Sequence, residues 1–209
     1  DRAVEATNQG NVFIATDSEE VMKVCQSVGA QTIMTSKNCA TGTDRIAELS
    51  TRIRSKIYIN LQGDEPLMDM NNIKKMIAAG MRDPDSIVNG WAKIETQKEY
   101  FSRTIPKVVL KCDNSLMYMS RSPIPGNKEN EFKTGKKQIC VYSFPYAALK
   151  FMLENSSKSP VEAVEDIEIL RFHEMGWNIK MIELSGSSIA VDTPGDLQRV
   201  RKEMTKRLS

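Results

Sequence analysis

The feature that most constrains this chain is a short apolar segment that ends in an acidic turn. Residues 57–61 read Ile-Tyr-Ile-Asn-Leu, and the next five read Gln-Gly-Asp-Glu-Pro. An apolar, β-branched run of this length predicts a buried strand of a parallel sheet. Gly63 permits a turn that a Cβ would obstruct, and Pro66 prevents the strand from continuing. Asp64 therefore follows the carboxyl end of a central strand, where open α/β sheets bind ligands.

An acid at this position has two interpretations. Mg²⁺ takes one or two carboxylates and fills its octahedron with phosphate and water oxygens, so Asp64 is a candidate metal ligand. A strand followed by an ordinary acidic turn has the same composition. A second acid, Asp192, precedes Thr193 and Pro194 at the start of a basic final helix. Asp192 fits either a capping role or a second metal carboxylate that converges on Asp64.

Strand and helix patterns alternate through the first half of the chain. Strands are expected at 11–17, 31–35, 57–61 and 86–94, and helices start near Ser18, Thr43, Asn71 and Gln97. This order predicts a parallel sheet with helices on both faces. In the first of these helices, the apolar stripe expected to face inward consists of Val21, Val24, Cys25 and Val28.

The pattern changes in the second half. Strands at 107–111 and 116–120 are separated by Cys-Asp-Asn-Ser, which predicts a hairpin. The longest helix is expected at 160–175, with its glutamates mainly on the solvated side. Between and after these lie a charged loop at 126–135, a strand at 138–144, a helix at 146–154 and a strand at 178–184.

The polar loop before the second major helix is a further candidate site. Thr41 and Thr43 both suit a helix cap, and the amides at a helix start attract anions. A solvated loop with a capping threonine explains the same residues.

Composition narrows the function classes. The 209 residues are 40% hydrophobic and 27% charged, which suits one large α/β domain or two small ones. A net charge of +2 gives no strong field toward nucleic acid or an anionic membrane. No apolar run reaches the roughly 18 residues of a spanning helix, and no signal peptide is visible. Four scattered cysteines without a CxxC pair favour reduced thiols in a cytoplasmic protein.

Eight short motifs stand in a specific order. They are Ala15-Thr16-Asp17, Thr41-Gly42-Thr43-Asp44-Arg45, Gln62-Gly63-Asp64-Glu65-Pro66, Lys107-Val108-Val109, Ser120-Arg121-Ser122-Pro123-Ile124-Pro125, Val141-Tyr142-Ser143-Phe144, Pro160-Val161-Glu162 and Val191-Asp192-Thr193-Pro194. With them, residues 11–203 resemble the CMP-Kdo synthetases (3-deoxy-manno-octulosonate cytidylyltransferases), which belong to the sugar nucleotidyltransferases. The resemblance implies one nucleotidyltransferase domain over 1–209, with a Rossmann-like mixed, mostly parallel sheet flanked by helices. It also implies a small β arm at about 107–144 that covers the sugar and forms a homodimer.

The resemblance implies a reaction in which CTP and the acidic 2-keto sugar Kdo give CMP-Kdo and pyrophosphate. The anomeric hydroxyl attacks the α-phosphorus in line, and Mg²⁺ neutralises the triphosphate. The implied setting is the cytoplasm, in lipopolysaccharide or capsule biosynthesis, with neither nucleic acid nor a membrane as partner. The implied metal ligands, which are also the catalytic residues, are Asp64 and Asp192. The implied nucleotide-binding residues are Gly42, Thr43, Arg45 and Gln62, and the implied sugar-binding residues are Arg121, Gln138, Tyr142 and Glu162.

Two departures from the family pattern leave alternatives open. The N-terminal phosphate-binding segment of the family, about forty residues, is absent here, so the chain alone is expected to be poorly active. Gln138 stands where relatives often carry a histidine, and glutamine cannot carry charge. The same chemistry on an amino-Kdo or a nonulosonic acid is therefore an alternative, as is an inactive nucleotide-binding homologue. A nicotinamide-dependent dehydrogenase is disfavoured because no GxGxxG follows a strand.

Overall fold

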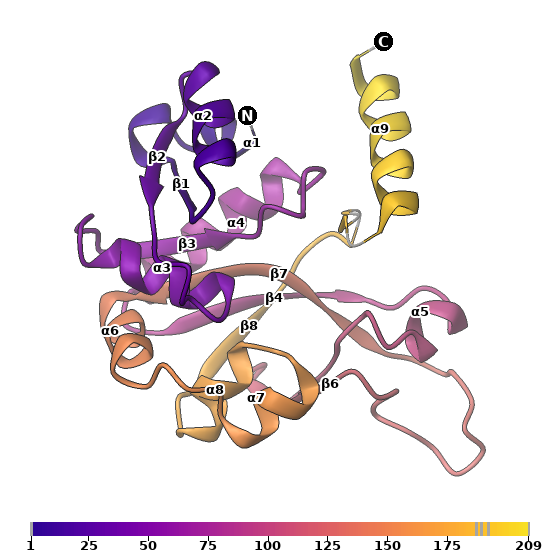
Figure 1. The fold of residues 1–209 in the computed structure, drawn as a ribbon. Helices are drawn as coiled ribbons and strands as arrows, with labels where there is room; N and C mark the ends of the chain where they lie inside the picture. Colours follow the sequence, from indigo (N-terminus) through magenta and orange to yellow (C-terminus); the bar gives the residue numbers. More distant parts are fainter. Residues whose placement is uncertain (1, 187, 189, 192, 209) are drawn as a thin grey trace.

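A computed structural model describes residues 2–186, 188, 190, 191 and 193–208, and it has a mixed sheet flanked by helices (Figure 1). The mixed α/β class expected from the sequence is confirmed. In chain order the elements are α1 (Arg2–Ala6), the 3-10 turn η1 (Gln9–Asn11), β1 (Phe13–Thr16), α2 (Glu19–Ser27), β2 (Gln31–Met34), α3 (Gly42–Ser50), β3 (Ile57–Leu61), α4 (Met70–Arg82), β4 (Ile87–Lys93), α5 (Gln97–Phe101), β5 (Lys107–Leu110), β6 (Leu116–Ser120), β7 (Lys136–Pro145), α6 (Tyr146–Glu154), α7 (Pro160–Glu165), α8 (Ile169–Glu174), β8 (Ile179–Glu183) and α9 (Pro194–Leu208).

Strand pairing differs from the expected, mostly parallel sheet. The ten-residue strand β7 pairs antiparallel with β3, β4 and β5, and only β8 joins β4 in parallel. The predicted hairpin is present as β5 and β6. Strands β1 and β2 form a separate parallel pair, and within the described residues neither pairs with β3. Strand β7, which comes later in the chain than both, thus lies between β3 and β4 in the sheet. The local alternation of strand and helix patterns does not predict this insertion.

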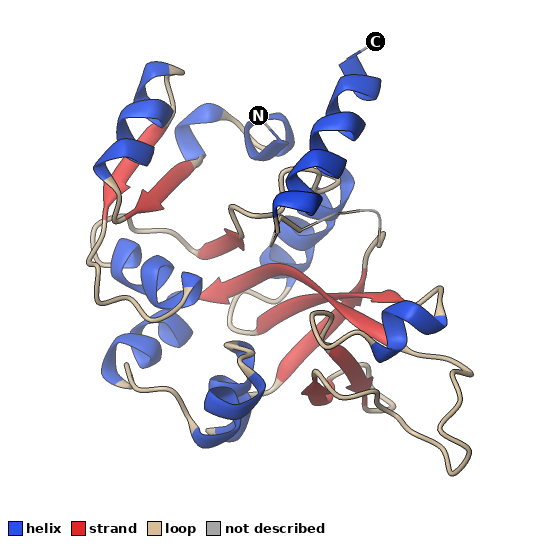
Figure 2. Ribbon diagram, turned by 45° about the vertical axis from the view of Figure 1, so that its right-hand side comes forward, coloured by secondary structure: helices blue, strands red, loops and turns tan. Residues whose placement is uncertain are grey.

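Side chains alternate along β7 between two apolar cores. Phe144 faces the core under α3, α6 and α8, where its ring stacks on Tyr142 and packs at a tilt against Phe172. Val141 faces the opposite core, against α4, with Met76. Figure 2 shows helices on both faces of the sheet. Gln138 and Tyr142 therefore share one face of the sheet, whereas Ile139 and Val141 share the other.

The long helix expected at 160–175 is broken into α7 and α8. Asp166 ends α7 with a left-handed backbone, φ 51°. The Arg121 side chain caps this end: its Nε donates to the carbonyl of Glu165 at 2.6 Å and its Nη2 to that of Asp166 at 2.8 Å. The break turns Glu168 inward, away from the solvated side expected for it.

The expected inward stripe of α2 is also wrong. Val21, Val24 and Val28 are 44%, 62% and 77% exposed, and no described residue of α2 is buried. The helix packs mainly on the β1–β2 pair, and two strands are too narrow to cover its apolar face. Helix α9 extends away from the sheet, although Val200 is buried (Figure 1). Among the described helices, none is long and apolar enough to cross a bilayer.

Candidate active site

The acidic turn after β3 lies beside the segment that precedes α9. Asp64 is exposed, and its carbonyl accepts a hydrogen bond from the Val191 amide at 2.9 Å. The Ser188 hydroxyl donates to the Glu65 carboxylate. Two motifs that are distant in sequence are therefore adjacent in space. Asp192 lies outside the described residues, so its pairing with Asp64 at a metal stays a prediction.

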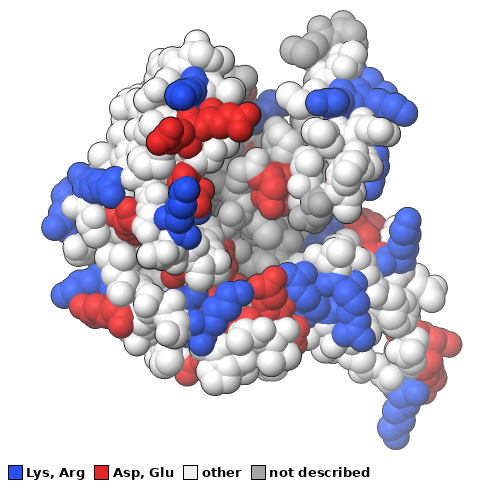
Figure 3. Space-filling view, in the orientation of Figure 1, with Lys and Arg blue, Asp and Glu red and all other residues white. Residues whose placement is uncertain are grey.

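Acidic side chains line the hollow between the β1–β2 unit and α9, while Lys and Arg gather along its lower rim (Figure 3). Among the residues with described positions, no three of the types His, Cys, Asp and Glu form a metal-binding group.

The first turn of α3 fits closely against the turn after β3. Thr41 caps the helix, because its hydroxyl oxygen accepts from the Asp44 amide at 3.2 Å. A Cβ on Gly42 would lie 2.6 Å from Oε1 of Gln62, so this position has little room for a larger residue. The structure thus brings together Gly42, Thr43 and Gln62, three of the predicted nucleotide-binding residues.

Glu168 joins these two turns and was missed by the sequence reasoning. Its Oε1 accepts from Nε2 of Gln62 at 2.9 Å, and its Oε2 accepts from the Thr43 amide at 3.1 Å. Burial raises the pKa of Glu168 above its ordinary value. The one sequence signal for the break that turns it inward is Asp166, since aspartate adopts left-handed backbone more readily than most residues.

The predicted sugar residues of β7 approach the same carboxylate. Nε2 of Gln138 lies 3.1 Å from the Tyr142 hydroxyl and 3.1 Å from Oδ1 of Asn89. Burial raises the pKa of Tyr142 well above its ordinary value, and the neighbouring Cys140 and Glu168 raise it further. Gln62, Gln138 and Tyr142 thus belong to one polar cluster, centred on Glu168.

Arg121 lies at the C-terminal end of α7 and is held by its surroundings. Its backbone amide donates to the Glu165 carboxylate at 2.8 Å, and its Nη1 donates to the Arg103 carbonyl at 3.2 Å. The side chain remains 32% exposed, so part of the guanidinium faces solvent. All three guanidinium nitrogens already donate to backbone carbonyls, so a carboxylate could reach only the exposed N–H groups that remain.

Glu162 occupies a different place from the one expected for a sugar ligand. It is fully buried, and its two oxygens accept from Nε and Nη2 of Arg171 at 2.6 and 2.7 Å. Nη1 of Arg171 continues to Asp44 Oδ1 at 2.9 Å, which ties α7 and α8 to α3. Because Glu162 is fully buried in this ion pair, whereas Glu168 is only partly buried, Glu168 is the better candidate for an acceptor of sugar hydroxyls.

Arg45 connects α3 to the β1–β2 pair. Its Nη1 donates to the Thr35 hydroxyl at 2.6 Å, and its Nη2 lies 3.3 Å from Oδ2 of Asp17. Arg45 therefore does not join the cluster around Glu168, and it lies at the ends of β1 and β2. A direct role in nucleotide binding stays a prediction.

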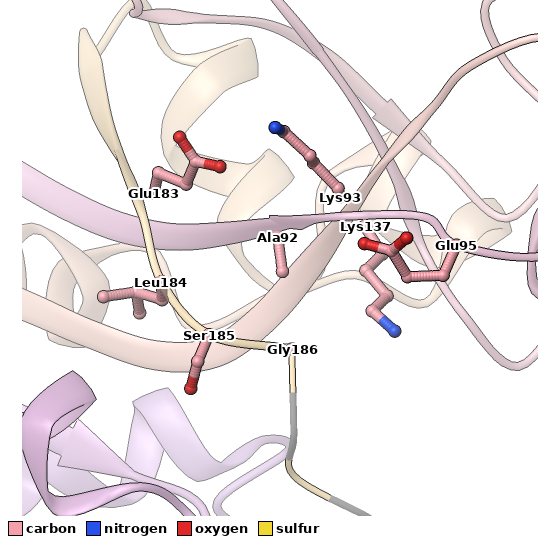
Figure 4. Close-up of a pocket in the computed structure, with 8 residues that line it drawn as sticks. All are labelled: Ala92, Lys93, Glu95, Lys137, Glu183, Leu184, Ser185 and Gly186. Carbon is pink, nitrogen blue, oxygen red and sulfur yellow. The ribbon is translucent and has the colours of Figure 1, made fainter.

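A surface cavity lies apart from this cluster. It has a volume of about 300 Å³, and Figure 4 shows its lining residues, which include Lys93, Glu95, Lys137 and Glu183. Lys137 donates to Glu99 at 2.5 Å, and Ala92 at its floor belongs to the core on the opposite face from Tyr142. The cavity is therefore not the predicted sugar site.

Comparisons with known proteins identify the family. The family profile described as "Cytidylyltransferase" matches residues 1–181. The chain is 35% identical to a 3-deoxy-manno-octulosonate cytidylyltransferase of Geotalea daltonii, in an alignment that covers 99% of this chain and 86% of the relative. The chain belongs to the CMP-Kdo synthetase family. An Escherichia coli member is 31% identical over 100% of this chain and 85% of its own length.

Solved structures agree with this family. A CMP:2-keto-3-deoxy-manno-octonic acid synthetase complexed with CTP superimposes with a TM-score of 0.89 at 30% identity, covering 99% of this chain and 85% of the other. A putative glucose-1-phosphate thymidylyltransferase of Bacillus anthracis matches at TM-score 0.64 and 13% identity, over 96% and 78% of the two chains. The second likeness shows the shared fold alone. As a CMP-Kdo synthetase family member, the chain is a nucleotidyltransferase with a polar cluster at the junction of α3, β3 and α8.

Proposed function

We propose that this protein transfers a cytidylyl group from CTP to Kdo, giving CMP-Kdo and pyrophosphate. The observation that supports this most is the position of Glu168, which contacts Gln62 and Thr43 together. The turn after β3 and the first turn of α3 would hold the nucleotide, and the β7 side chains would hold the sugar. A carboxylate between the two lies where the two substrates must meet for an in-line attack.

Asp64 and Asp192 would hold Mg²⁺, because carboxylates at a sheet edge suit this hard cation. Asp64 is exposed and beside Val191, so its carboxylate is accessible to a metal–triphosphate complex. Bound there, the metal would supply charge neutralisation on the triphosphate. The protein's own contribution is to fix the α-phosphorus opposite the anomeric hydroxyl.

The sugar would be oriented by three kinds of group. Glu168 would accept hydrogen bonds from hydroxyls, Gln62 would contact both substrates, and the fork of Arg121 would hold the sugar carboxylate. Arg121 also caps α7, so the residue that binds the carboxylate also stabilises the backbone break that presents Glu168. One arginine would thus couple sugar recognition to the geometry of the acceptor.

The arm at about 107–144 would form a homodimer and cover the sugar, and the reaction would take place in the cytoplasm for lipopolysaccharide or capsule biosynthesis. Strand β6 supports the arm's role in assembly: it lies at the edge of the sheet, with Met117 and Tyr118 51% and 36% exposed. The alternatives for the substrate are an amino-Kdo or a nonulosonic acid, which share the keto-acid group that Arg121 would bind.

Pyrophosphate release tests the proposal. The protein is assayed with Mg²⁺, CTP and Kdo, beside Asp64→Asn and a matched control, Asp85→Asn, which changes another exposed aspartate. Release that requires Kdo and collapses only in Asp64→Asn supports the proposal. Mg²⁺-dependent CTP binding without release would redirect the search to other keto-sugar acids. A protein that neither binds CTP nor releases pyrophosphate would contradict the proposal and favour an inactive homologue.

A further inference from the structure

A buried asparagine in β4 fills a bulge in the sheet. The register between β4 and β7 shifts after Asn89, which is fully buried opposite Tyr142. Nδ2 of Asn89 donates to the carbonyls of Ile139 and Val141 at 3.1 and 2.9 Å. Both of its N–H groups therefore have acceptors, and a flipped amide would place oxygen against two carbonyl oxygens. The orientation of the Asn89 amide is fixed.

The fixed amide of Asn89 determines the orientation of Gln138. Because Oδ1 of Asn89 can only accept, Gln138 must direct Nε2 toward it, at 3.1 Å. The second N–H of Gln138 then donates to the Tyr142 oxygen at 3.1 Å. No described group donates to Oε1 of Gln138. This oxygen is also not one of the two buried side-chain atoms without a partner in the described part of the chain, Ser143 Oγ and His173 Nδ1, so it reaches solvent.

The next step along this chain is the Tyr142 hydroxyl. Its oxygen accepts from Gln138, and its proton has two neighbouring acceptors, the Glu168 carboxylate and the Cys140 sulfur. Glu168 accepts also from Gln62 and from the Thr43 amide. The chain Asn89–Gln138–Tyr142–Glu168 thus uses its donors internally. What it leaves for a ligand are acceptor atoms, Oε1 of Gln138 and the carboxylate of Glu168.

We infer that Asn89 is a specificity-determining positioning residue: by fixing the amide of Gln138, it makes Oε1 a permanent, uncharged acceptor. The inference rests on the proposed function, which places the sugar acid at Gln138. The site then selects a keto-sugar acid that presents a hydrogen-bond donor, either a hydroxyl or an ammonium group, to this oxygen. It rejects an analogue that presents only an acceptor there, because two acceptors would face each other without a proton between them.

Glutamine does not titrate, so this preference is independent of pH between 6 and 9 on the protein's side. The titratable groups in and around this chain are Glu168, Tyr142 and Cys140, whose pKa values burial raises, and Glu65 and Asp64 in the turn after β3, whose charges raise the pKa of Cys140 further. At Oε1 itself, a hydroxyl donor on the sugar would bind equally well across this range. An ammonium donor would lose affinity only when the ligand itself loses its proton.

The test compares sugar acids that differ at one group. Kdo, its singly deoxygenated and singly O-methylated analogues and its amino analogue are assayed by pyrophosphate release at pH 6, 7.5 and 9. Gln138→Leu keeps the approximate side-chain size and removes the acceptor, and Asn89→Ala leaves the acceptor free to rotate. Asn72→Ala is the matched control: it is also buried, and its amide contacts Ser185 on the other face.

The wild-type enzyme is expected to reject one O-methyl analogue strongly. In Gln138→Leu and Asn89→Ala this discrimination should fall about 10- to 100-fold, through the KM of the sugar and without change in the KM of CTP. The double variant should lose no more than either single variant, because both act on one contact. Asn72→Ala should keep the wild-type discrimination even where it lowers Tm.

The experiment distinguishes a failure of this inference from a failure of the proposed function. Wild-type turnover with unchanged discrimination in folded Asn89→Ala would overturn this inference and leave the proposed function intact. Absence of turnover with every sugar acid in the wild type would overturn both. If Asn89→Ala does not fold, Gln138→Leu decides alone: unchanged discrimination in that variant rejects Oε1 as the selecting atom.

Discussion

Nε2 of Gln62 lies 2.9 Å from Oε1 of Glu168, a residue 106 positions further along the chain. This contact joins the turn after β3 to the break between α7 and α8. Gln62 is a predicted nucleotide-binding residue, and Glu168 is the acceptor that we propose for the sugar hydroxyls. The Glu168 carboxylate also accepts a hydrogen bond from the Thr43 amide, so it holds three segments of the chain together.

Replacing this carboxylate should separate activity from stability. Glu168→Gln is expected to lower kcat/KM for the sugar about 10²- to 10³-fold, since the amide offers one acceptor where the carboxylate offers two oxygens. The KM of CTP should change less than about threefold. Steady-state kinetics with each substrate varied measures both effects. Glu183→Gln, an exposed glutamate on β8, is the control, and equal loss in both variants would reject a specific role.

The same substitution should change the pH dependence of stability. Burial raises the pKa of Glu168 in the folded state above its ordinary 4.5, so the folded protein binds a proton more readily than the unfolded chain. Stability is therefore lost as pH rises through the interval above 4.5. In Glu168→Gln this loss disappears, so the free energy of unfolding of the variant should change less with pH between 4 and 7 than that of the wild type. Urea denaturation at pH 4 to 7 tests it, and a parallel pH profile in the two proteins would contradict the expectation.

Removing the buried guanidinium should be much more damaging. Arg171→Met leaves Glu162 and Asp44 without their partner in the interior. The expected loss is about 3–5 kcal/mol of unfolding free energy, measured by urea denaturation. The double variant Arg171→Met with Glu162→Met should recover part of it, because no buried charge is left unpaired at that position. A single variant within about 1 kcal/mol of the wild type would show that the pair contributes little.

Replacing Asp64 should affect ligand binding and leave stability nearly unchanged. Its side chain is exposed, so Asp64→Asn should change the free energy of unfolding by no more than about 0.5 kcal/mol. Calorimetric CTP binding should nevertheless lose its dependence on Mg²⁺, because an amide is a weaker ligand for this cation than a carboxylate. Retained Mg²⁺ dependence in a folded variant would remove Asp64 from the metal site.

Particular residues show how far the sequence predicts this structure. The β3 strand, the glycine turn, the Thr41 cap and the β5–β6 hairpin follow from local propensity, and each is present. The break at Asp166 does not follow, because it depends on a cap supplied by Arg121, which lies just past the end of β6 and 45 positions earlier. Helical periodicity instead predicts one helix through this region and places Glu168 in solvent.

The missed residues share a physical cause. Asn89, Glu168 and Arg171 act through partners that strand pairing and helix packing bring to them. Periodicity in a single sequence reports which face of an element is apolar. It does not report which buried polar groups will meet. The motifs of the family located Gln62, Gln138 and Tyr142, but the carboxylate at their centre became visible only in the structure.

Lys107, at the start of β5, gives a further prediction, on alkaline stability. Its ammonium is fully buried and donates to the carbonyls of Ser102, Ile105 and Arg121 at 2.6, 2.7 and 2.6 Å. Burial, with the nearby Arg103 and Arg121, lowers its pKa from 10.5 to about 8. Between these two values the unfolded chain binds the proton and the folded protein largely does not. The free energy of unfolding should therefore rise with pH across this interval.

Lys107→Met should remove this rise and, at pH 7, cost about 1–3 kcal/mol because three buried carbonyls lose their donor. Urea denaturation at pH 7, 8, 9 and 10 measures both effects, with Lys111→Met, an exposed lysine just past the end of β5, as the matched control. The gap between wild type and Lys107→Met should widen as the pH rises, whereas Lys111→Met should follow the wild type. A constant gap would mean that the folded-state pKa of Lys107 stays near 10.5, and that its three carbonyl contacts offset the cost of burying the charge.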